Sequence, residues 1–176
     1  MSGRQPSPDF WSGKSVAVTG GGGFLGKPTV KLLESLGADV RVTRSADHDL
    51  TSEAATREAL DGAQVVLHLA ANVGGIGFNR RNPAPLAYDN TMMGANVFEV
   101  SRQLGVQKLV AACSVCAYPL NTPVPFREET IWDGYPEPSN APYGLAKKML
   151  LVWSDAYRRQ YGFDSCAPVM ANLYGP

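Results

Sequence analysis

The feature that most constrains the fold is a glycine-rich turn between a short apolar run and a stretch with helical spacing. The run is Ser15-Val-Ala-Val-Thr19, the turn is Gly20-Gly-Gly-Gly23-Phe-Leu-Gly26, and the helical spacing continues to Leu36. β-branched residues favour a strand, and glycines let the next turn approach a phosphate at a helix N-terminus. This order is typical of a dinucleotide-binding unit, whereas the glycines alone would also suit an ordinary tight turn.

Four more apolar runs follow the first and alternate with helical stretches. The runs cover residues 39–43, 63–69, 106–112 and 164–171, and the helical stretches cover 52–60, 85–104 and 142–161. Strands that alternate with helices pair in parallel through right-handed crossovers. The sequence therefore predicts an α/β fold with a doubly wound parallel sheet of the Rossmann type, and we expect the strand order 3-2-1-4-5. We expect the aperiodic segment 118–142 over the carboxyl ends of the strands, where such sheets bind ligands.

The composition excludes several classes of protein. The 176 residues carry 16 basic and 16 acidic side chains, so the net charge is zero and neither nucleic acid nor an anionic membrane is an expected partner. No apolar run approaches the roughly 20 residues of a transmembrane helix. The polar, proline-rich start has no signal-peptide pattern, so we expect a cytoplasmic protein with a flexible lead at residues 1–12 and one domain at residues 13–176.

The three cysteines, Cys113, Cys116 and Cys166, argue against a disulfide framework because their number is odd. Cys113-Ser-Val-Cys116 forms a C-x-x-C, but it ends an apolar run instead of opening a helix as in a thioredoxin-like site. A zinc site would need a second pair of ligands, and only His48 and His68 are available elsewhere. We therefore expect neither a metal site nor a redox role.

A tyrosine and a lysine share one face of the last predicted helix. Tyr143 and Lys147 are one turn apart, so we expect the ammonium to lower the pKa of the phenol from its usual value of about 10. Y-x-x-x-K often occurs by chance as a solvated pair. Here, however, Ser114 follows the fourth strand, where its hydroxyl would meet Tyr143. Together the three residues predict a catalytic Ser-Tyr-Lys set, although Ser114 alone could be a turn or cap residue.

The end of the second predicted strand bears on the choice between NAD and NADP. An NAD-preferring site usually has an acidic residue there, which binds the ribose 2′-hydroxyl. This chain has Arg44 and Ser45, whose guanidinium and hydroxyl suit a 2′-phosphate, so we expect NADP(H). The alternative is that Arg44 is a solvated loop charge.

Several motifs resemble known families. The spacing G-x-x-G-x-x-G resembles the short-chain dehydrogenase/reductase family, its extended branch in particular. Asn72-Val-Gly-Gly-Ile76 and Cys113-Ser-Val-Cys-Ala-Tyr-Pro119 together resemble the GDP-L-fucose synthase family, bifunctional 3,5-epimerase-4-reductases of GDP-4-keto-6-deoxy-D-mannose. The stretch from Pro138 to Lys147 and Asn172-Leu-Tyr-Gly-Pro176 fit the same family, so the resemblance runs from about Val16 to the last residue.

The resemblance implies an NADPH-dependent oxidoreductase and isomerase that makes GDP-L-fucose by 3,5-epimerisation and hydride reduction at C4. It implies that Cys116 exchanges protons beside the ketone, although a free cysteine is often just a small buried apolar residue. Tyr143 would protonate the C4 oxygen, and Ser114 would hydrogen-bond to it. Lys147 would hold the nicotinamide ribose and lower the pKa of Tyr143. In the family, a histidine downstream of Asn172-Leu-Tyr-Gly-Pro176 is the partner acid.

The resemblance also implies the cofactor site. Asp49-Leu50 is similar to the family's adenine-contacting pair, although Asp47 and Asp49 could equally cap the next helix. Ala70 and Ala71 resemble the small residues on which the cofactor lies, and we expect His68 to be a packed structural histidine. The implied cofactor-binding residues are Gly20, Gly21, Gly22, Gly23, Phe24, Leu25, Gly26, Arg44, Asp49, Leu50, Ala70, Ala71, Ala112, Cys113, Lys147, Met170, Asn172 and Leu173.

Two expectations concern the extent of the chain and its partners. The family's smaller C-terminal domain binds the GDP-sugar, and we expect residues 13–176 to be an NADP-binding domain that lacks most of it. This leaves open another nucleotide-sugar epimerase or dehydratase of the extended branch, a cofactor-binding module without catalysis, or a structural subunit. Because family members dimerise through the helices at 85–104 and 142–161, we expect a homodimer, although the apolar faces of these helices could belong to the core.

Overall fold

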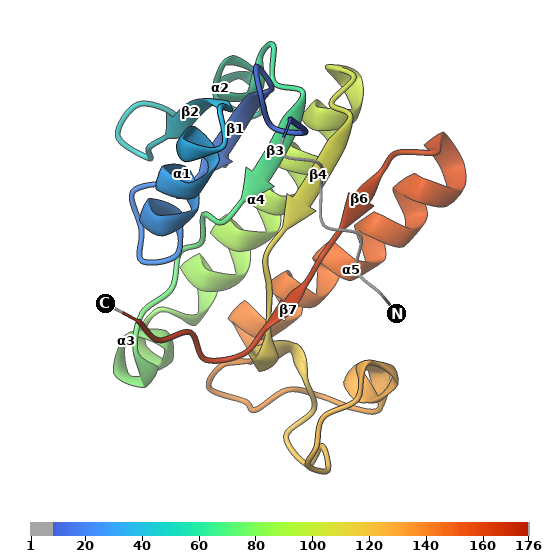
Figure 1. Cartoon of the computed structure of the whole chain (residues 1–176). Coiled ribbons are helices and arrows are strands. Elements are labelled where there is room, and N and C mark those ends of the chain that lie inside the picture. Colours follow the sequence, from blue (N-terminus) through green and yellow to red (C-terminus); the bar gives the residue numbers. More distant parts are fainter. Residues whose placement is uncertain (1–8, 176) are drawn as a thin grey trace.

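A computed structural model of the chain describes residues 9–175, and its centre is a five-stranded parallel sheet (Figure 1). The strands, in their order across the sheet, are β2 (Asp39–Thr43), β1 (Ser15–Thr19), β3 (Val65–His68), β4 (Lys108–Ala111) and β6 (Ser165–Cys166). Residues 1–8 of the predicted lead lie outside the described residues. Within the rest of that lead, the N–H of Ser12 donates to the carbonyl of Asp9, and Trp11 packs against the core.

The predicted doubly wound sheet is confirmed, but the predicted strand order 3-2-1-4-5 is wrong. The third strand pairs with β1 instead of β2, so Val16 lies opposite Val40 on one side and Val65 on the other. Helix α1 (Gly26–Ser35) connects β1 to β2 over one face, and α2 (Glu53–Leu60) returns to β3 over the other. Right-handed crossovers in opposite directions place their helices on opposite faces. The chain therefore reverses at β2, and β1 lies between β2 and β3.

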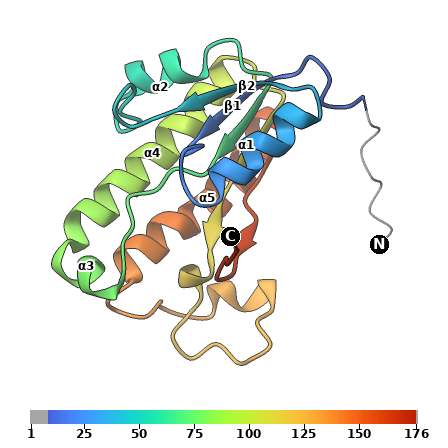
Figure 2. The same cartoon turned by 60° about the vertical axis from the view of Figure 1, so that its left-hand side comes forward.

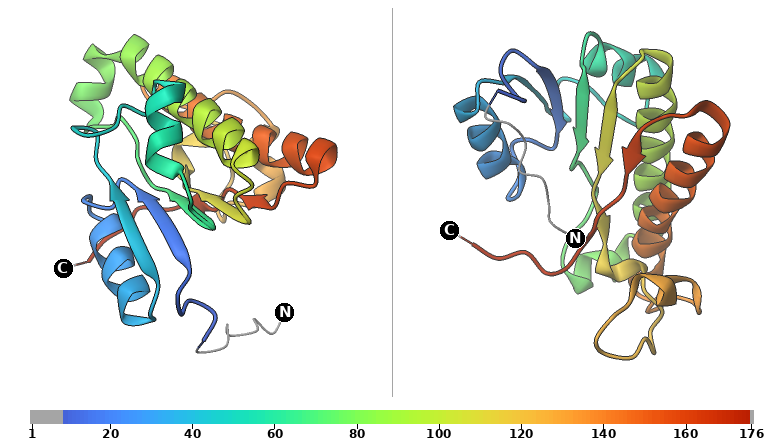
Figure 3. Two further views of the ribbon diagram at one scale, coloured as in Figure 1. Left: turned by 90° about the horizontal axis from the view of Figure 1, so that it is seen from above. Right: turned by 45° about the vertical axis from the view of Figure 1, so that its right-hand side comes forward.

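Helices cover both faces of the sheet. Figure 3 shows α1 alone on one face and α2, α4 (Pro83–Gln103) and α5 (Ala141–Tyr161) on the other. Leu33 of α1 packs in a small cluster with valines of β1 and β3, whereas the larger core under α4 and α5 contains Phe98 and Leu150. A Cβ on Gly94 would lie 2.5 Å from the Trp153 ring, so the absence of a side chain lets α4 and α5 pack closely. None of the helices among residues 9–175 has the length and apolar character needed to cross a membrane.

The fifth predicted strand, at residues 164–171, is split in two. β6 pairs with β4, and after Ala167-Pro168 the chain continues as β7 (Val169–Met170), which pairs with β5 (Cys113–Ser114). Pro168 has no N–H to donate to a ladder, and it separates the two pairings. Three short helices were not predicted, namely α3 (Ile76–Arg81), η1 (Val115–Ala117) and η2 (Glu128–Trp132).

The aperiodic segment between η1 and α5 closes on itself at its base. Pro119 and Pro136 form an antiparallel bridge, and the N–H of Leu120 donates to the carbonyl of Tyr135 at 3.1 Å. Lys148 of α5 is buried and donates to the carbonyl of Gly134 at 3.5 Å. Figure 2 shows the segment projecting beyond the carboxyl ends of the strands. It therefore borders the edge of the sheet at which the site residues lie.

Candidate active site

The glycine turn after β1 is too tightly packed to accept side chains at its two ends. A Cβ on Gly26 would lie 2.2 Å from the carbonyl oxygen of Gly20. Gly20 has a φ of +69°, and a Cβ there would lie 2.7 Å from the nitrogen of Ala70. A Cβ on Gly22, in contrast, would meet nothing within 4 Å. The two outer glycines fix the turn against β3, and the middle of the turn faces open space.

A cavity of about 630 Å³ opens in front of this turn. Its walls come from the carboxyl ends of β1, β2 and β3, where the direction of the crossovers reverses and doubly wound sheets bind their ligands. The predicted cofactor residues that line it are Gly20, Gly22, Gly23, Arg44, Asp49, Leu50, Ala70 and Ala71. The lining residues that the sequence analysis did not assign to the cofactor include Thr43, His48, Thr51, Asn72, Asp89 and Met93.

The other predicted cofactor residues lie outside the lining of this cavity. They are Gly21, Phe24, Leu25, Gly26, Ala112, Cys113, Lys147, Met170, Asn172 and Leu173. Gly21 and Gly26 are buried beneath the turn, whereas Phe24 and Leu173 are exposed. The segment after β7 crosses the carboxyl edge of the sheet toward the turn, because a Cβ on Gly175 would lie 3.9 Å from the Phe24 ring. Their cofactor contacts remain predictions.

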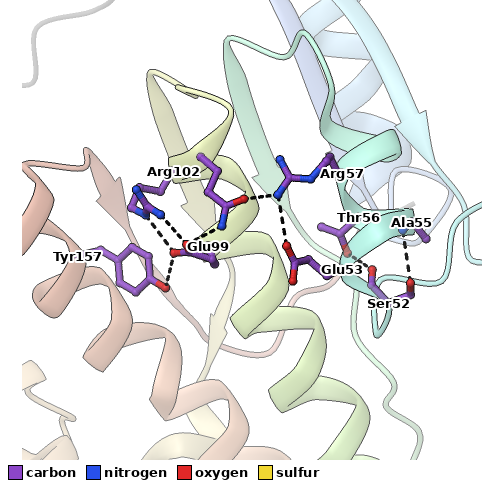
Figure 4. Close-up of polar contacts among 9 residues, drawn as sticks. Ser52, Glu53, Ala55, Thr56, Arg57, Glu99, Arg102 and Tyr157 are labelled. Carbon is purple, nitrogen blue, oxygen red and sulfur yellow. Dashed lines mark hydrogen bonds and ion pairs between the residues drawn. The ribbon is translucent and has the colours of Figure 1, made fainter.

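Asp49 has a local hydrogen-bonding role at the rim of the cavity. One of its carboxylate oxygens accepts from the N–H of Thr51 at 2.9 Å and from the Thr51 hydroxyl at 2.8 Å. The backbone hydrogen bond, followed by the hydroxyl, lowers the pKa of Asp49. The N-cap of α2 is Ser52, whose hydroxyl accepts from the N–H of Ala55 at 3.4 Å (Figure 4). The alternative in which Asp47 or Asp49 caps this helix is therefore wrong.

The predicted tyrosine and lysine lie on the buried face of α5. Tyr143 is 9% exposed and Lys147 is 4% exposed, and the Lys147 Nζ lies 5.9 Å from the centroid of the Tyr143 ring. Ser114, at the end of β5, accepts from the N–H of Cys116 at 3.2 Å and also interacts with the phenol of Tyr143. The structure thus brings Ser114 and Tyr143 together, and the serine also has the cap role that the sequence left open.

A glycine places Cys116 beside Tyr143. A Cβ on Gly144 would lie 2.2 Å from the carbonyl oxygen of Cys116, so α5 and η1 approach backbone to backbone at this point. The half-buried thiol of Cys116 is close enough to the phenol of Tyr143 for its charge to raise the pKa of that phenol. In the sequence, Gly144 stands out only as part of the motif from Tyr143 to Lys147. Its position next to the tyrosine was the available signal.

Burial dominates the protonation of both groups on α5. It raises the pKa of Tyr143 to about 12, with the Cys116 charge adding to the rise and Ser114 opposing it. It lowers the pKa of Lys147 to about 8, and Lys147 forms no ion pair with any acid among residues 9–175. The predicted lowering of the Tyr143 pKa by Lys147 is therefore wrong, because the loss of solvent around the phenol raises this pKa and Lys147 is not among the groups that shift it. At neutral pH Tyr143 carries its proton and can act as an acid.

His68 is a structural residue below this site, as predicted. It is 1% exposed, and its Nδ1 lies 2.8 Å from the hydroxyl of Thr19. Since that hydroxyl oxygen accepts from the N–H of Ala70, its hydrogen is available to the imidazole. Burial, with a smaller effect from Lys147, lowers the pKa of His68 to about 3, so the ring is neutral.

Cys113 is also part of the packing. Its side chain is buried, and its Sγ donates to the carbonyl of Lys147 at 3.3 Å. Burial raises the pKa of the Cys113 thiol. The contact joins β5 to α5 directly behind the candidate catalytic residues.

The fold and the cavity together define a doubly wound α/β domain whose glycine turn and sheet edge have the form of a dinucleotide site. Residues 16–176 match the NAD dependent epimerase/dehydratase family, and the chain belongs to this enzyme family. It is similar to a GDP-L-fucose synthase of Sinorhizobium fredii (37% identity over 166 residues) and to one of Dictyostelium discoideum (36% over 170 residues). The matches cover 93% and 94% of this chain but 53% of each relative, so the chain spans about half the length of these curated relatives.

Solved structures show the same likeness. A GDP-D-glycero-L-gluco-heptose synthase from Campylobacter jejuni, determined in the presence of NADPH, is 27% identical with a TM-score of 0.88 over 93% of this chain and 48% of its own. A GDP-L-fucose synthetase from Naegleria fowleri bound to NADP is 28% identical with a TM-score of 0.80 over 93% of this chain and 52% of its own. The resemblance that the sequence motifs predicted is confirmed.

Proposed function

We propose that the protein is an NADPH-dependent nucleotide-sugar epimerase-reductase that converts GDP-4-keto-6-deoxy-D-mannose to GDP-L-fucose. The observation that carries this proposal is the close approach of η1 to α5 at Gly144, which brings Cys116 near enough to Tyr143 for the charge of its thiol to raise the pKa of the phenol. Reduction alone requires the acid, whereas inversion beside a ketone also requires a group that removes a carbon-bound proton. The relatives named GDP-L-fucose synthase support the same assignment.

The main cavity fits the adenosine and diphosphate of a nicotinamide cofactor. Helix α1 begins behind the glycine turn with no side-chain cap and no acidic residue in its first turn. The N–H of Lys27 already donates to the carbonyl of Gly23, and Pro28 has no N–H. In this turn of the helix the N–H of Gly26 therefore remains for a phosphate. Gly22 leaves open space in front of the turn. At the other end of the cavity Arg44 and Ser45 suit the 2′-phosphate of NADPH. When bound, NADPH supplies the hydride for C4.

The side chains around Tyr143 then have separate tasks. Tyr143, protonated at neutral pH, donates its proton to the C4 oxygen, and Ser114 hydrogen-bonds to the same oxygen. The Lys147 ammonium holds the nicotinamide ribose. Cys116 removes a proton from C3 and C5, which the adjacent ketone acidifies. The acid that returns the proton from the opposite face is expected beyond residue 176.

Solvent deuterium exchange tests this proposal. The protein expressed from its complete reading frame is incubated with the keto-sugar in deuterated water, and label at C3 and C5 is measured together with NADPH oxidation. We expect Cys116→Ser to abolish labelling while NADPH binding is retained, and Cys166→Ser, a half-buried cysteine in β6, to behave as wild type. Labelling of Cys116→Ser at the wild-type rate would overturn the role of Cys116. NADPH binding by the wild type without labelling or oxidation would indicate a cofactor-binding module.

The predicted homodimer also stands as a proposal. Leu145, Met149 and Val152 lie on one face of α5 and are 36–40% exposed, and Tyr88 of α4 is 63% exposed. These side chains suit an isologous interface built from α4 and α5. Light scattering is expected to give the mass of a dimer, and Met149→Lys is expected to reduce it to that of one chain. A wild-type mass of one chain would contradict the dimer.

A further inference from the structure

The turn after β2 contains a histidine that no sequence motif identified. His48 lines the main cavity together with Thr43, Arg44 and Ser45. The N–H groups of Asp47 and His48 both donate to the carbonyl of Arg44, at 3.1 and 2.9 Å. The chain therefore folds back on itself, and His48 returns to the end of the strand at which the proposed 2′-phosphate would lie.

Unpaired polar atoms gather at this end of the cavity. The hydroxyl oxygen of Thr43 and the Nδ1 of His48 are both buried and have no hydrogen-bond partner among residues 9–175. Thr43 as a whole is only 5% exposed. In the part of the chain that the structure describes, the only other such atom is the hydroxyl oxygen of Ser101, in α4. Buried polar atoms are nearly always paired, so two unpaired atoms, one at the end of β2 and one in the turn after it, show that protein groups do not satisfy the polar side chains at this end of the cavity.

The guanidinium at this end of the cavity is available for an anion. Arg44 forms no ion pair or side-chain hydrogen bond with any residue between 9 and 175. The two carboxylates in the cavity lining already have donors of their own. Asp49 accepts from Thr51, and Asp89 accepts from the side-chain amide of Asn72 at 2.7 Å. The uncommitted groups are therefore a guanidinium, two hydroxyls and an imidazole, all of which can donate to a phosphate.

We propose that His48 is a specificity-determining residue that selects NADPH over NADH by donating a hydrogen bond to the 2′-phosphate, in addition to Arg44. Because the Nδ1 of His48 is enclosed by protein atoms, Nε2 is the nitrogen that reaches the ligand. NADH has a hydroxyl in place of this phosphate and gains little from the contact. The inference rests on the proposed function, because it requires a nicotinamide dinucleotide in the main cavity.

Fluorescence titrations of this chain with NADPH and with NADH test the inference without any turnover. His48→Asn places an amide nitrogen near the position of Nδ1, whereas His48→Gln can place one near Nε2. We expect His48→Asn to weaken NADPH binding roughly 10- to 100-fold, the usual range for a hydrogen bond to a charged group, and to leave NADH binding unchanged. His48→Gln should retain most of the NADPH affinity. Arg41→Gln is the control for charge, because Arg41 donates to the carbonyl of Asp61 outside the cavity.

The outcomes separate this inference from the proposed function. If His48→Asn lost the same factor of affinity for NADPH and for NADH, the ring would support the adenosine or the fold. If His48→Asn bound NADPH with wild-type affinity, the ring would not contribute to binding. Either result overturns the role of His48. A wild-type chain that binds neither cofactor would overturn the proposed function as well. Competition with 2′,5′-ADP and 5′-AMP adds a check, because only 2′,5′-ADP should distinguish His48→Asn from the wild type.

Discussion

Two tyrosines at opposite ends of α5 have the same pKa and opposite surroundings. The pKa of each is raised to about 12, and burial is the largest cause for both. Tyr157 donates its hydroxyl proton to a carboxylate oxygen of Glu99 at 3.0 Å (Figure 4). Tyr143 has a serine, a cysteine and a lysine nearby. The perturbed pKa alone therefore does not distinguish a structural tyrosine from a candidate acid.

The partners of the two tyrosines make the distinction. At Tyr157, hydrogen bonding to Glu99 and the charge of Glu99 add to the effect of burial, so its proton is committed to a protein carboxylate. At Tyr143 no carboxylate of the described residues competes for the proton, and the hydroxyl of Ser114 opposes the rise in pKa. An oxygen of a bound substrate can therefore accept the proton of Tyr143 without displacing a protein anion.

The charged side chains at the two ends of α5 also differ, because among the described residues those near Tyr157 are paired and Lys147 is not. Glu99 accepts from Arg102, Gln103 and Tyr157, and Gln103 also accepts from Arg57, which pairs with Glu53 (Figure 4). Every charge in this network has a partner, and it ties α2, α4 and α5 together. Lys147, at the other end, is buried and has no acidic partner in the described part of the chain. Favourable contacts stabilise one end, whereas the other holds an unpaired charge at the candidate site.

Replacing each tyrosine with phenylalanine should give the largest difference between the two ends. We expect Tyr143→Phe to lower the rate of ketone reduction about 10²- to 10⁴-fold, because the acid is removed. Tyr157→Phe should leave the rate unchanged and cost about 1 kcal/mol of stability, the usual value of one hydrogen bond. NADPH oxidation by the protein from its complete reading frame and urea unfolding measure the two effects. Similar rates for the two variants would remove the distinction.

Lys147→Met should stabilise the protein while it abolishes turnover. Burial lowers the pKa of Lys147 from 10.5 to about 8, so the unfolded chain binds the proton more tightly than the folded protein. This group therefore disfavours folding below about pH 8, and stability recovers as the pH rises from about 8 to 10.5. At pH 7 the gain from Lys147→Met should reach about 3 kcal/mol, since each pKa unit is worth about 1.4 kcal/mol.

Urea unfolding at pH 7 and pH 10 measures this gain, which should shrink at the higher pH. Lys27→Met, on the exposed side of α1, is the control and should change the free energy of unfolding little. A variant of Lys147 that is less stable than the wild type at pH 7 would show that the ammonium has a favourable partner, and the two ends of α5 would then be alike.

Local patterns in the sequence were enough to predict the main strands and the long helices. The glycine turn, the long helices and the pairing of Tyr143 with Lys147 depend on residues that are close in the chain. The strand order depends on the reversal at β2, a tertiary event that no local pattern encodes. The direction of the Tyr143 pKa was wrong for the same reason, because burial is a sum over β5, η1 and α5.

The sequence did not predict the roles of residues that belong to no motif, either at the cavity or at the Tyr157 end of α5. His48 lies in a short turn, and Asp89 and Met93 reach the cavity from α4. The hydrogen bond between Glu99 and Tyr157 joins residues 58 positions apart. No sequence spacing links these three residues to the cavity, and none links Glu99 to Tyr157. They become neighbours only when the helices pack against each other and against the sheet.

Glu99→Gln should give the smallest effect, confined to the structural end. The hydrogen bond from Arg102 is the main cause that lowers the pKa of Glu99 from 4.5 to about 2, so its contribution is present above pH 4.5 and is lost as the pH falls toward 2. Since Glu99 is 34% exposed and solvent screens it, we expect a loss of about 1 kcal/mol at pH 7.

Thermal unfolding at pH 7 and pH 3 should show the difference between Glu99→Gln and the wild type narrowing in acid, with NADPH affinity unchanged. A change in NADPH affinity would mean that the network transmits its state along α5. The division of α5 into a stabilising end and a chemical end would then fail, because a substitution in α4, beside Tyr157, would alter the site around Tyr143.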